Sequence, residues 1–339
     1  MEKLGADSTE SRVFPKIYGA RNRDPQILQN STSGGIFSAF TKVIIENGGY
    51  VCGAVFDNEY RVIHTVANNI EQCRKMCGAK YVQSELGGAL DEIVRLMANG
   101  RTVLFVGTPC QVAGVKNIAE LKKLSDKLIT VDIICHGVPS PGIFREHIQA
   151  IEKSYGKVLS YSFRDKEKGW RGQNVTIRTE SGIVPDDDAK VFTKLYFNSL
   201  IIRPSCFSCQ FASVDRSGDI TIGDFWGIEG ENPEYDDNKG ISEILINTDK
   251  GLGLFHAIGG DVEYFEVKST SYIQPNMKSP TEQSVVAGDF WKQYKKHGFA
   301  CTKKFLRSLR QRILCRKVIR KIKYLIEKGF SSVIAPLWR

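Results

Sequence analysis

The first clear pattern in the chain is helical. Apolar residues recur every three or four positions, as on the buried face of an amphipathic helix: Ile36, Phe37, Phe40, Val43 and Ile44. This pattern predicts a helix over residues 33–47, which ends at the Gly48-Gly49 pair. Residues 50–56 and 61–66 then predict a hairpin across a polar turn, and residues 84–98 predict a second helix.

The middle of the chain alternates short apolar runs with helical patterns. Residues 102–107 and 128–134 predict strands, and residues 111–124 predict a helix. Residues 141–155 predict another helix, with Ser140 as its N-cap and Pro141 at its first position. This βαβα order implies two parallel strands that are buried on both faces. The loops that follow the two strands therefore lie at the same edge of the sheet.

Beyond residue 158 the pattern changes to shorter strands, with one helix near 252–258. The strands are predicted over residues 158–164, 174–178, 219–223, 243–248 and 262–267. We therefore expect an α/β (mixed α+β) fold, in which a central mixed sheet contains the parallel βαβα segment and a basic C-terminal helical appendage follows. The predicted organisation is a mobile leader over residues 1–16, one domain over 17–290 and a helical tail over 291–339.

The distribution of charge separates the tail from the rest of the chain. The formal net charge is +9, but residues 301–339 hold 12 Lys or Arg and one acid. The preceding 300 residues hold 35 Lys or Arg and 37 Asp or Glu, a net charge of −2. A near-neutral body does not offer the broad basic face that binds phosphates, so we expect no nucleic-acid partner.

Two absences bear on location. The sequence has no apolar run of roughly 18 residues, the length of a membrane-spanning helix. Its polar start, MEKLGADSTESR, lacks the apolar stretch of a secretory signal. We therefore expect a cytoplasmic protein. In a reducing cytosol its nine cysteines remain thiols, which favours metal binding or redox chemistry over disulfides.

The tail contains a basic amphipathic pattern over residues 315–326. One helix face carries Cys315, Val318, Ile319, Ile322, Leu325 and Ile326, and the other largely carries Arg316, Lys317, Arg320, Lys321 and Lys323. Gly329 ends this predicted helix, and FSSVIAPLWR follows. Such a helix either packs its apolar face on the body or lies peripherally on the inner face of the membrane, against anionic lipids. The sequence leaves both interpretations open.

Four cysteines have settings that suit a metal centre. Cys110 in GTPCQ and Cys135 in CHGVPS follow the two predicted parallel strands, where ligand sites of open α/β sheets collect. Cys206 and Cys209 form a C-x2-C pair, whose turn presents two thiolates to one metal. Together the four thiols fit an iron–sulfur cluster or a zinc ion.

Each of these cysteines also has a simpler interpretation. A cysteine after a strand is often a small buried hydrophobe, and a single C-x2-C pair suits zinc, a cluster or a redox dithiol. His136 follows Cys135, but a structural role explains it more simply than metal binding. We assign the remaining cysteines to packing or to the surface, because none lies in a turn with a partner at metal-ligand spacing: Cys52, Cys73, Cys77, Cys301 and Cys315.

A second group of residues suits a flavin. Ser33, Gly34 and Gly35 open the first predicted helix, where exposed N–H groups beside glycines suit a pyrophosphate. An ordinary helix cap explains the same residues. Lys80 is a candidate to neutralise a phosphate or a reduced flavin. Asp224 and Trp226, in the DFWG segment, follow a predicted strand, where the indole either covers a cofactor or packs in the core.

Taken together and in order, these motifs resemble the beta-subunit family of the coenzyme F420-reducing hydrogenases and dehydrogenases, in its bacterial branch. The matching stretches span about residues 30–248 and are NSTSGGIFSAF, CGAKYVQS, VLFVGTPCQVAG, DIICHGVPSP, SFRDKEKGW, RPSCFSCQFA, SGDITIGDFWGI and DDNKGISEILINT. The resemblance implies an iron–sulfur flavoprotein oxidoreductase. In it, a [4Fe-4S] cluster exchanges electrons with FAD, and FAD exchanges hydride with a deazaflavin or another organic acceptor.

The resemblance also implies site residues and partners. By motif position, the cluster ligands would be Cys110, Cys135, Cys206 and Cys209, and the flavin would lie near Ser33, Gly34, Gly35, Lys80 and the DFWG turn. Many bacterial relatives begin with a cysteine-rich ferredoxin-like region, whereas residues 1–30 here contain no cysteine. We therefore expect a separate ferredoxin-like electron donor. The substrate would be a small molecule or a lipid-linked compound, as in surface-polysaccharide assembly, where bacterial relatives often occur. The alternative is a zinc-stabilised binding or scaffold protein without redox activity.

Overall fold

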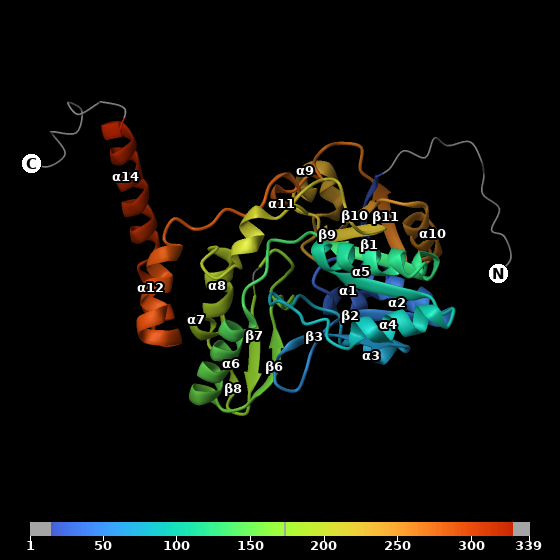
Figure 1. Cartoon of the computed structure of the whole chain (residues 1–339), viewed down its shortest axis with the longest axis horizontal. Coiled ribbons are helices and arrows are strands. Elements are labelled where there is room, and N and C mark those ends of the chain that lie inside the picture. The colour runs from blue at the N-terminus through green and yellow to red at the C-terminus, as the bar shows by residue number, and fades with distance from the viewer. Residues whose placement is uncertain (1–14, 173, 328–339) are drawn as a thin grey trace, which may run out of the picture.

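The computed structural model describes residues 15–172 and 174–327. They form an eight-stranded sheet with helices on both faces, a smaller unit around a three-stranded sheet, and a helical appendage (Figure 1). Of the leader predicted over residues 1–16, residues 1–14 lie outside the described part, and Lys16 is the first residue of a strand. The predicted segment after residue 327 also lies outside it.

The large sheet is mixed, as predicted. Its strands are β1 (Lys16–Asn22), β2 (Tyr50–Phe56), β3 (Val62–Ala67), β4 (Val103–Gly107), β5 (Leu128–Ile133), β9 (Ile220–Asp224), β10 (Ser242–Ile246) and β11 (Val262–Glu266). The strand order is β11-β1-β10-β9-β5-β4-β2-β3. The neighbours β2, β4, β5 and β9 run parallel, and the pairs at both ends of the sheet are antiparallel. The predicted parallel βαβα segment therefore forms the centre of the sheet.

The sequence patterns did not predict β1. This strand lies between β10 and β11 and is antiparallel to both, with Lys16 opposite Ile246 and Tyr18 opposite Glu266. Its sequence, KIYGARN, ends in three residues that include two polar side chains. Arg21 bonds Asp237 at 2.7 Å, so this charged residue of the strand is paired.

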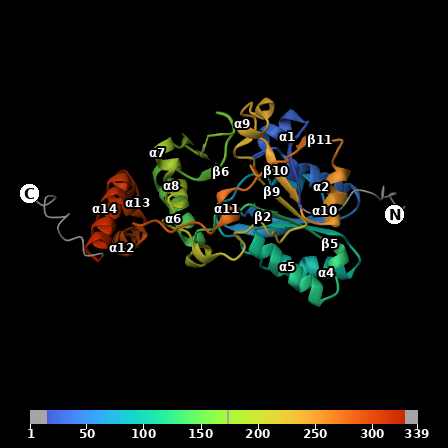
Figure 2. The same ribbon diagram turned by 90° about the horizontal axis from the view of Figure 1, so that it is seen from above.

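Helices cover both faces of the large sheet (Figure 2). One face carries α2 (Ile36–Glu46) and α10 (Asp249–Ala257), with the short helices α1 (Pro25–Asn30) and α3 (Ile70–Arg74) beside them. The other face carries α4 (Ala89–Ala98) and α5 (Pro109–Leu121). Each face has its own apolar core, because α2 buries its stripe against β2, β4 and β10, and α4 and α5 pack on β4 and β5.

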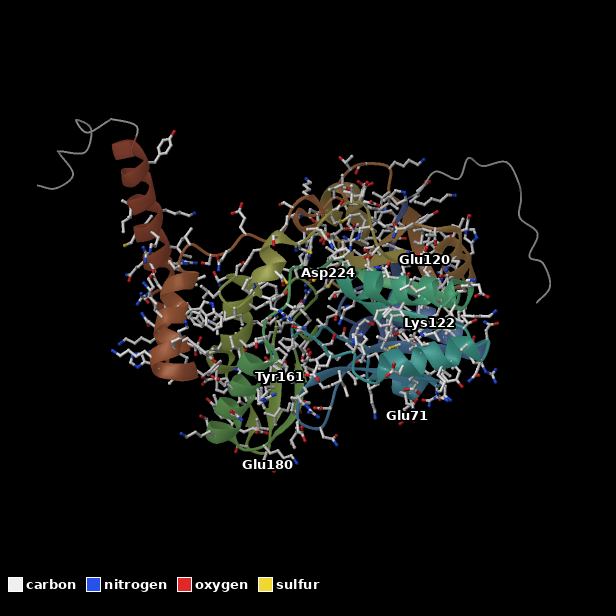
Figure 3. All side chains as sticks on the ribbon, viewed as in Figure 1. Glu71, Glu120, Lys122, Tyr161, Glu180 and Asp224 are labelled. Atoms are coloured by element: carbon white, nitrogen blue, oxygen red, sulfur yellow. The ribbon has the colours of Figure 1, made fainter. Side chains whose placement is uncertain are left out.

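The smaller unit packs around a cluster of aromatic side chains. It contains β6 (Val158–Ser162), β7 (Thr176–Thr179), β8 (Gly182–Ile183), α6 (Pro141–Tyr155), α7 (Asp186–Ala189) and α8 (Val191–Phe197). Phe144 of α6 packs edge-on against Tyr161 and Phe192, with ring centroids 5.2 and 5.0 Å away, and Figure 3 shows Tyr161 inside this unit. As predicted, α6 starts at Pro141, and the Ser140 hydroxyl accepts the Gly142 N–H at 3.2 Å.

The appendage is attached through the same core. Its helices are α12 (Ala287–His297), η4 (Gly298–Cys301), α13 (Thr302–Arg307) and α14 (Leu309–Glu327). Phe290, Phe305 and Leu309 belong to the apolar cluster of the smaller unit, and Ile313 packs against it, so the appendage packs on the body as far as Ile313 of α14. The rest of α14 extends away from the body (Figure 1). No helix within residues 15–172 and 174–327 is long and apolar enough to cross a membrane.

The remaining described elements are short connecting helices. They are η1 (Ser125–Lys127), η2 (Pro204–Ser208), α9 (Ile228–Glu231), η3 (Pro233–Tyr235) and α11 (Pro275–Lys278).

Candidate functional site

A cavity of about 900 Å³ opens where the large sheet meets the smaller unit. The carboxyl ends of β4, β5 and β9 form one wall, and the first turn of α2 forms another. Tyr196 and Phe197 close it from the smaller unit, and residues 76–84 line a further side. The cavity therefore occupies the sheet edge at which ligand sites of α/β proteins collect.

The first turn of α2 faces this cavity without a capping side chain. Ser33 and Gly35 line the cavity, and no side chain caps the helix at Gly35. By contrast, Ser140 caps α6 and Thr248 caps α10. The first N–H groups of a helix need acceptors, so those of α2 are available to a ligand in the cavity.

Gly34 has a different role from its neighbours. Its N–H donates to the Ser242 hydroxyl at 3.0 Å, and the Ser33 hydroxyl donates to the carbonyl of Ile241 at 2.6 Å. A Cβ on Gly34 would lie 2.3 Å from the carbonyl oxygen of Ala20. Gly34 therefore allows the loop to pack on β1 and β10, and it does not line the cavity.

Lys80 also lines the cavity, but its amino group binds its own loop. The Lys80 Nζ donates to the carbonyls of Met76, Cys77 and Gly78 at 3.2, 3.0 and 3.2 Å. Burial lowers the pKa of Lys80 to about 8. The half-buried side chain adds a positive charge to the wall of the cavity.

Asp224 and Trp226 belong to a network that the sequence did not reveal. The Asp224 carboxylate accepts bonds from Arg164 at 3.0 Å and from the Trp170 indole N–H at 2.8 Å. Trp226 stacks on Trp170 with ring centroids 4.9 Å apart, and the Arg164 guanidinium lies 5.5 Å from the Trp226 ring. Figure 3 shows Asp224 in the body, well away from Glu71 and Glu180. Arg164, Asp224 and Trp226 all line the cavity.

Lys166 connects helix α1 to two loops beside this network. Its amino group donates to the carbonyls of Leu28, Ser33 and Lys239 at 2.8, 2.5 and 2.7 Å. Burial lowers the pKa of Lys166 to about 8. Arg164 and Lys166 both lie in the SFRDKEKGW stretch, whose clustered charges and tryptophan were the available signal for these roles.

The four predicted cysteines gather at the sheet edge. Cys110 is exposed in the first turn of α5, Cys135 follows β5, and Cys206 lies in η2; all three line the cavity. Cys209 ends η2. Burial, together with the nearby Cys110, Cys206 and Cys209, raises the pKa of Cys135 to about 12. The four thiols are therefore close enough to interact electrostatically.

Gly137 lets two of these segments approach each other. Its N–H donates to the Cys135 sulfur at 3.3 Å, and its φ of +105° suits glycine. A Cβ on Gly137 would lie 2.9 Å from Ile202 Cγ2 and 3.1 Å from Cys206 Cβ. Among the described residues, no group of three or more His, Cys, Asp or Glu is arranged to hold a metal ion. The thiols are thus neighbours without forming a closed ligand set.

His136 makes contacts of a structural kind. Its Nδ1 lies 3.4 Å from the Asn276 amide nitrogen and 3.3 Å from the Thr281 hydroxyl. Its ring packs edge-on against Tyr196, with centroids 5.3 Å apart.

A buried ion pair braces the segment that follows Cys209. Arg216 Nη2 lies 2.7 Å from Asp132 Oδ1, and the two side chains are 1% and 0% exposed. Arg216 also donates to the carbonyls of Phe211 and Ser213 at 3.3 and 3.1 Å, and the second Asp132 oxygen accepts the Gly218 N–H at 2.7 Å. The brace fixes the Cys209 segment to the strand that leads to Cys135.

The fold and the site define an α/β protein with a ligand cavity and four thiols at one edge of its parallel strands. Residues 100–271 match the family described as the C terminus of the coenzyme F420 hydrogenase/dehydrogenase beta subunit. This match covers just over half of the chain, and the protein belongs to that family. Membership places it among oxidoreductases that take part in electron transfer.

A solved structure agrees with this assignment at the level of fold. The chain is similar to a chain of the F420-reducing [NiFe] hydrogenase complex from Methanosarcina barkeri, studied by xenon derivatization. The TM-score is 0.52 at 20% sequence identity, and the match covers 86% of this chain and 90% of the other. No match is found among curated proteins.

Proposed function

We propose that the protein is an iron–sulfur flavoprotein oxidoreductase. Cys110, Cys135, Cys206 and Cys209 would hold a [4Fe-4S] cluster, and the cavity would hold FAD. When bound, the cluster passes electrons singly, and the flavin exchanges them in pairs, as hydride, with an organic acceptor. The observation that carries the proposal is that one cavity of about 900 Å³ is lined both by the uncapped turn of α2 and by three of these cysteines.

The donor set suits such a cluster. Thiolates are the usual ligands of iron–sulfur clusters, and an N–H donor to a sulfur, like that of Gly137 to Cys135, favours the thiolate over the thiol. The close approach of the Gly137 loop to Cys206 brings thiols from two segments together. The brace between Asp132 and Arg216 would keep the Cys209 segment in place.

The wall of the cavity suits an anionic dinucleotide. Asp224 pairs with Arg164 at 3.0 Å, whereas the amino groups of Lys80 and Lys166 bond uncharged carbonyls. With pKa values of about 8, both lysines are mostly charged at neutral pH. Lys80 lines the cavity, and Lys166 lies behind its wall beside Asp224, so both favour a bound anion. The uncapped N–H groups of α2 would then bind the pyrophosphate.

The exposure of Cys110 supports an external electron donor. Cys110 lies at the surface, and Ile133, at the end of the neighbouring strand, is 38% exposed. A cluster at this edge would be accessible to a separate, ferredoxin-like protein.

The acceptor would be an organic molecule that enters beside Trp226. This indole lines the cavity and is 39% exposed, and its stacking on Trp170 holds it rigid for contact with a planar ring. The deazaflavin coenzyme named in the family's description is the first candidate. A lipid-linked or free substrate of polysaccharide assembly is the second, and assays of acceptor reduction with each will separate them.

The deciding experiment is purification without oxygen, followed by analysis of iron, sulfide, zinc and flavin. We expect a brown protein that contains iron and sulfide and that releases FAD on denaturation. Cys209→Ser should lose the iron, while Cys315→Ser, which alters an exposed cysteine outside the site, should retain it. Colourless protein containing zinc would overturn the proposal in favour of a zinc-stabilised scaffold. Unchanged iron in Cys209→Ser would remove this residue from the ligand set.

A further inference from the structure

One side of α14 contacts the body and the neighbouring helices, through both apolar and charged side chains. Leu309 and Ile313 pack against the core of the smaller unit. Arg316 bonds the Asp289 carboxylate of α12 at 2.9 Å through Nε, and the Arg312 guanidinium lies 4.8 Å from the Phe305 ring centroid. These contacts fix the rotation of α14 about its axis relative to the body.

That rotation turns the apolar stripe of α14 outward. Leu314, Val318 and Ile319 are 65, 48 and 54% exposed, and Cys315 is also exposed. Positions i, i+1, i+4 and i+5 lie on one side of an α-helix, so the four side chains form one surface. Packing of the stripe on the body, one of the two interpretations left open by the sequence, is not what the described part of α14 shows.

Cations flank the exposed stripe. The sequence of α14 contains seven Lys or Arg and one Glu. Arg310 and Lys317 are exposed and lie at the border of the stripe, about one turn from Leu314. A partner that binds an exposed apolar surface bordered by cations needs an apolar region to receive the stripe and negative charges to face the cations.

We propose that α14 docks on an anionic membrane surface and holds the body there as a peripheral protein. An anionic bilayer meets both requirements, because apolar side chains enter the boundary of the acyl chains while Lys and Arg remain among the headgroups. A second copy of the chain meets only the first, because it would bring an equally basic helix against the same cations. The projection of α14 from the body (Figure 1) leaves this surface accessible.

The test is co-sedimentation of the full chain with vesicles. We expect binding to vesicles of equal parts phosphatidylglycerol and phosphatidylcholine, and much weaker binding to phosphatidylcholine alone. Lys317→Ala should weaken binding to the anionic vesicles about five-fold, the usual effect of one basic residue near such a surface. Leu314→Asp/Val318→Asp should reduce binding further and remove it at high salt. Leu121→Asp, which alters an 84% exposed leucine on α5, is the matched control and should bind like the unaltered protein.

Each other result contradicts the proposal. Equal binding to neutral and anionic vesicles, or equal binding of the double variant and the Leu121 control, would exclude α14 as the lipid contact. No binding to either vesicle would exclude a membrane. A dimer in light scattering that dissociates in Leu314→Asp/Val318→Asp would assign the stripe to a second copy. Unchanged thermal unfolding of the variants will show that the body is intact, and none of these outcomes depends on the proposed cofactors.

Discussion

Asp132→Asn should be among the most destabilising conservative changes in this protein. Asp132 and Arg216 are 0% and 1% exposed and 2.7 Å apart. The substitution preserves size and removes the negative charge, so that the Arg216 guanidinium is left buried without its counter-ion. Arg216 keeps its bonds to main-chain carbonyls, but neutral acceptors do not replace a carboxylate.

The expected loss in the free energy of unfolding can be compared with that for an exposed ion pair. Removing one partner of a buried ion pair typically costs about 3–5 kcal/mol. The Lys42–Asp261 pair is 2.8 Å long, but its side chains are 46% and 34% exposed, and such pairs contribute about 0–1 kcal/mol. Asp261→Asn is therefore a matched control with the same change of chemistry. The double variant Asp132→Leu/Arg216→Met replaces the ion pair with an apolar contact and should recover most of the lost stability.

Urea unfolding followed by tryptophan fluorescence measures these differences. With a denaturant dependence of about 3 kcal/mol per molar, Asp132→Asn should lower the midpoint by roughly 1–1.7 M and Asp261→Asn by less than about 0.3 M. Equal shifts for the two variants would refute the reasoning, because they would mean that burial of Arg216 adds nothing to the cost. A double variant no more stable than Asp132→Asn would show that the charge itself is not the cause.

Two further predictions concern other buried positions. Glu243 is 0% exposed and accepts a bond from Gln274 at 2.6 Å, and burial raises its pKa to about 8. The folded state therefore holds a proton that the unfolded state releases near pH 4.5, so the free energy of unfolding falls as pH rises from about 5 to 8. In urea titrations at several pH values, Glu243→Gln should lack this fall in the free energy of unfolding. If the two proteins showed the same dependence on pH, Glu243 would not be the group responsible. Gly34→Ala should lower the free energy of unfolding by about 3 kcal/mol, the upper end of the usual cost of overpacking. The new Cβ would lie 2.3 Å from the carbonyl oxygen of Ala20, and a backbone atom cannot easily move away. Gly114→Ala, at a helical position with open space, should instead stabilise by about 0.5–1 kcal/mol; similar midpoints for the two alanine variants would show that crowding at Gly34 is relieved.

The centre of the fold could be predicted because its signals are local. Alternating apolar runs and helical patterns identified β4, β5, α5 and α6, and the βαβα order by itself placed Cys110 and Cys135 at one edge. Cys206 and Cys209 were joined to these two because their spacing suits a metal, and the family resemblance implied the same set of four. Nothing in the C-x2-C spacing indicates where in the fold the pair lies.

The charged networks of the site could not be predicted, because they join residues far apart in the chain. Arg164 meets Asp224 across 60 positions, and Asp132 meets Arg216 across 84. In a sequence, a lysine or arginine that will be buried looks the same as one that stays in solvent. Lys166 is an example, because only the packing of α1 and two loops around it shows that its amino group is enclosed.

The position of β1 between β10 and β11 has a consequence for the order of folding. Residues 16–22 leave the ribosome long before their partners, residues 242–246 and 262–266. The bonds from Ser33 to Ile241 and from Lys166 to Lys239 also wait for that late segment. The wall that carries α2 therefore closes only when most of the chain has been made, because contacts so distant in sequence form slowly. Until β9 and Ser242 have been made, the cavity lacks the wall that they contribute, so the ligand site can form only late in synthesis.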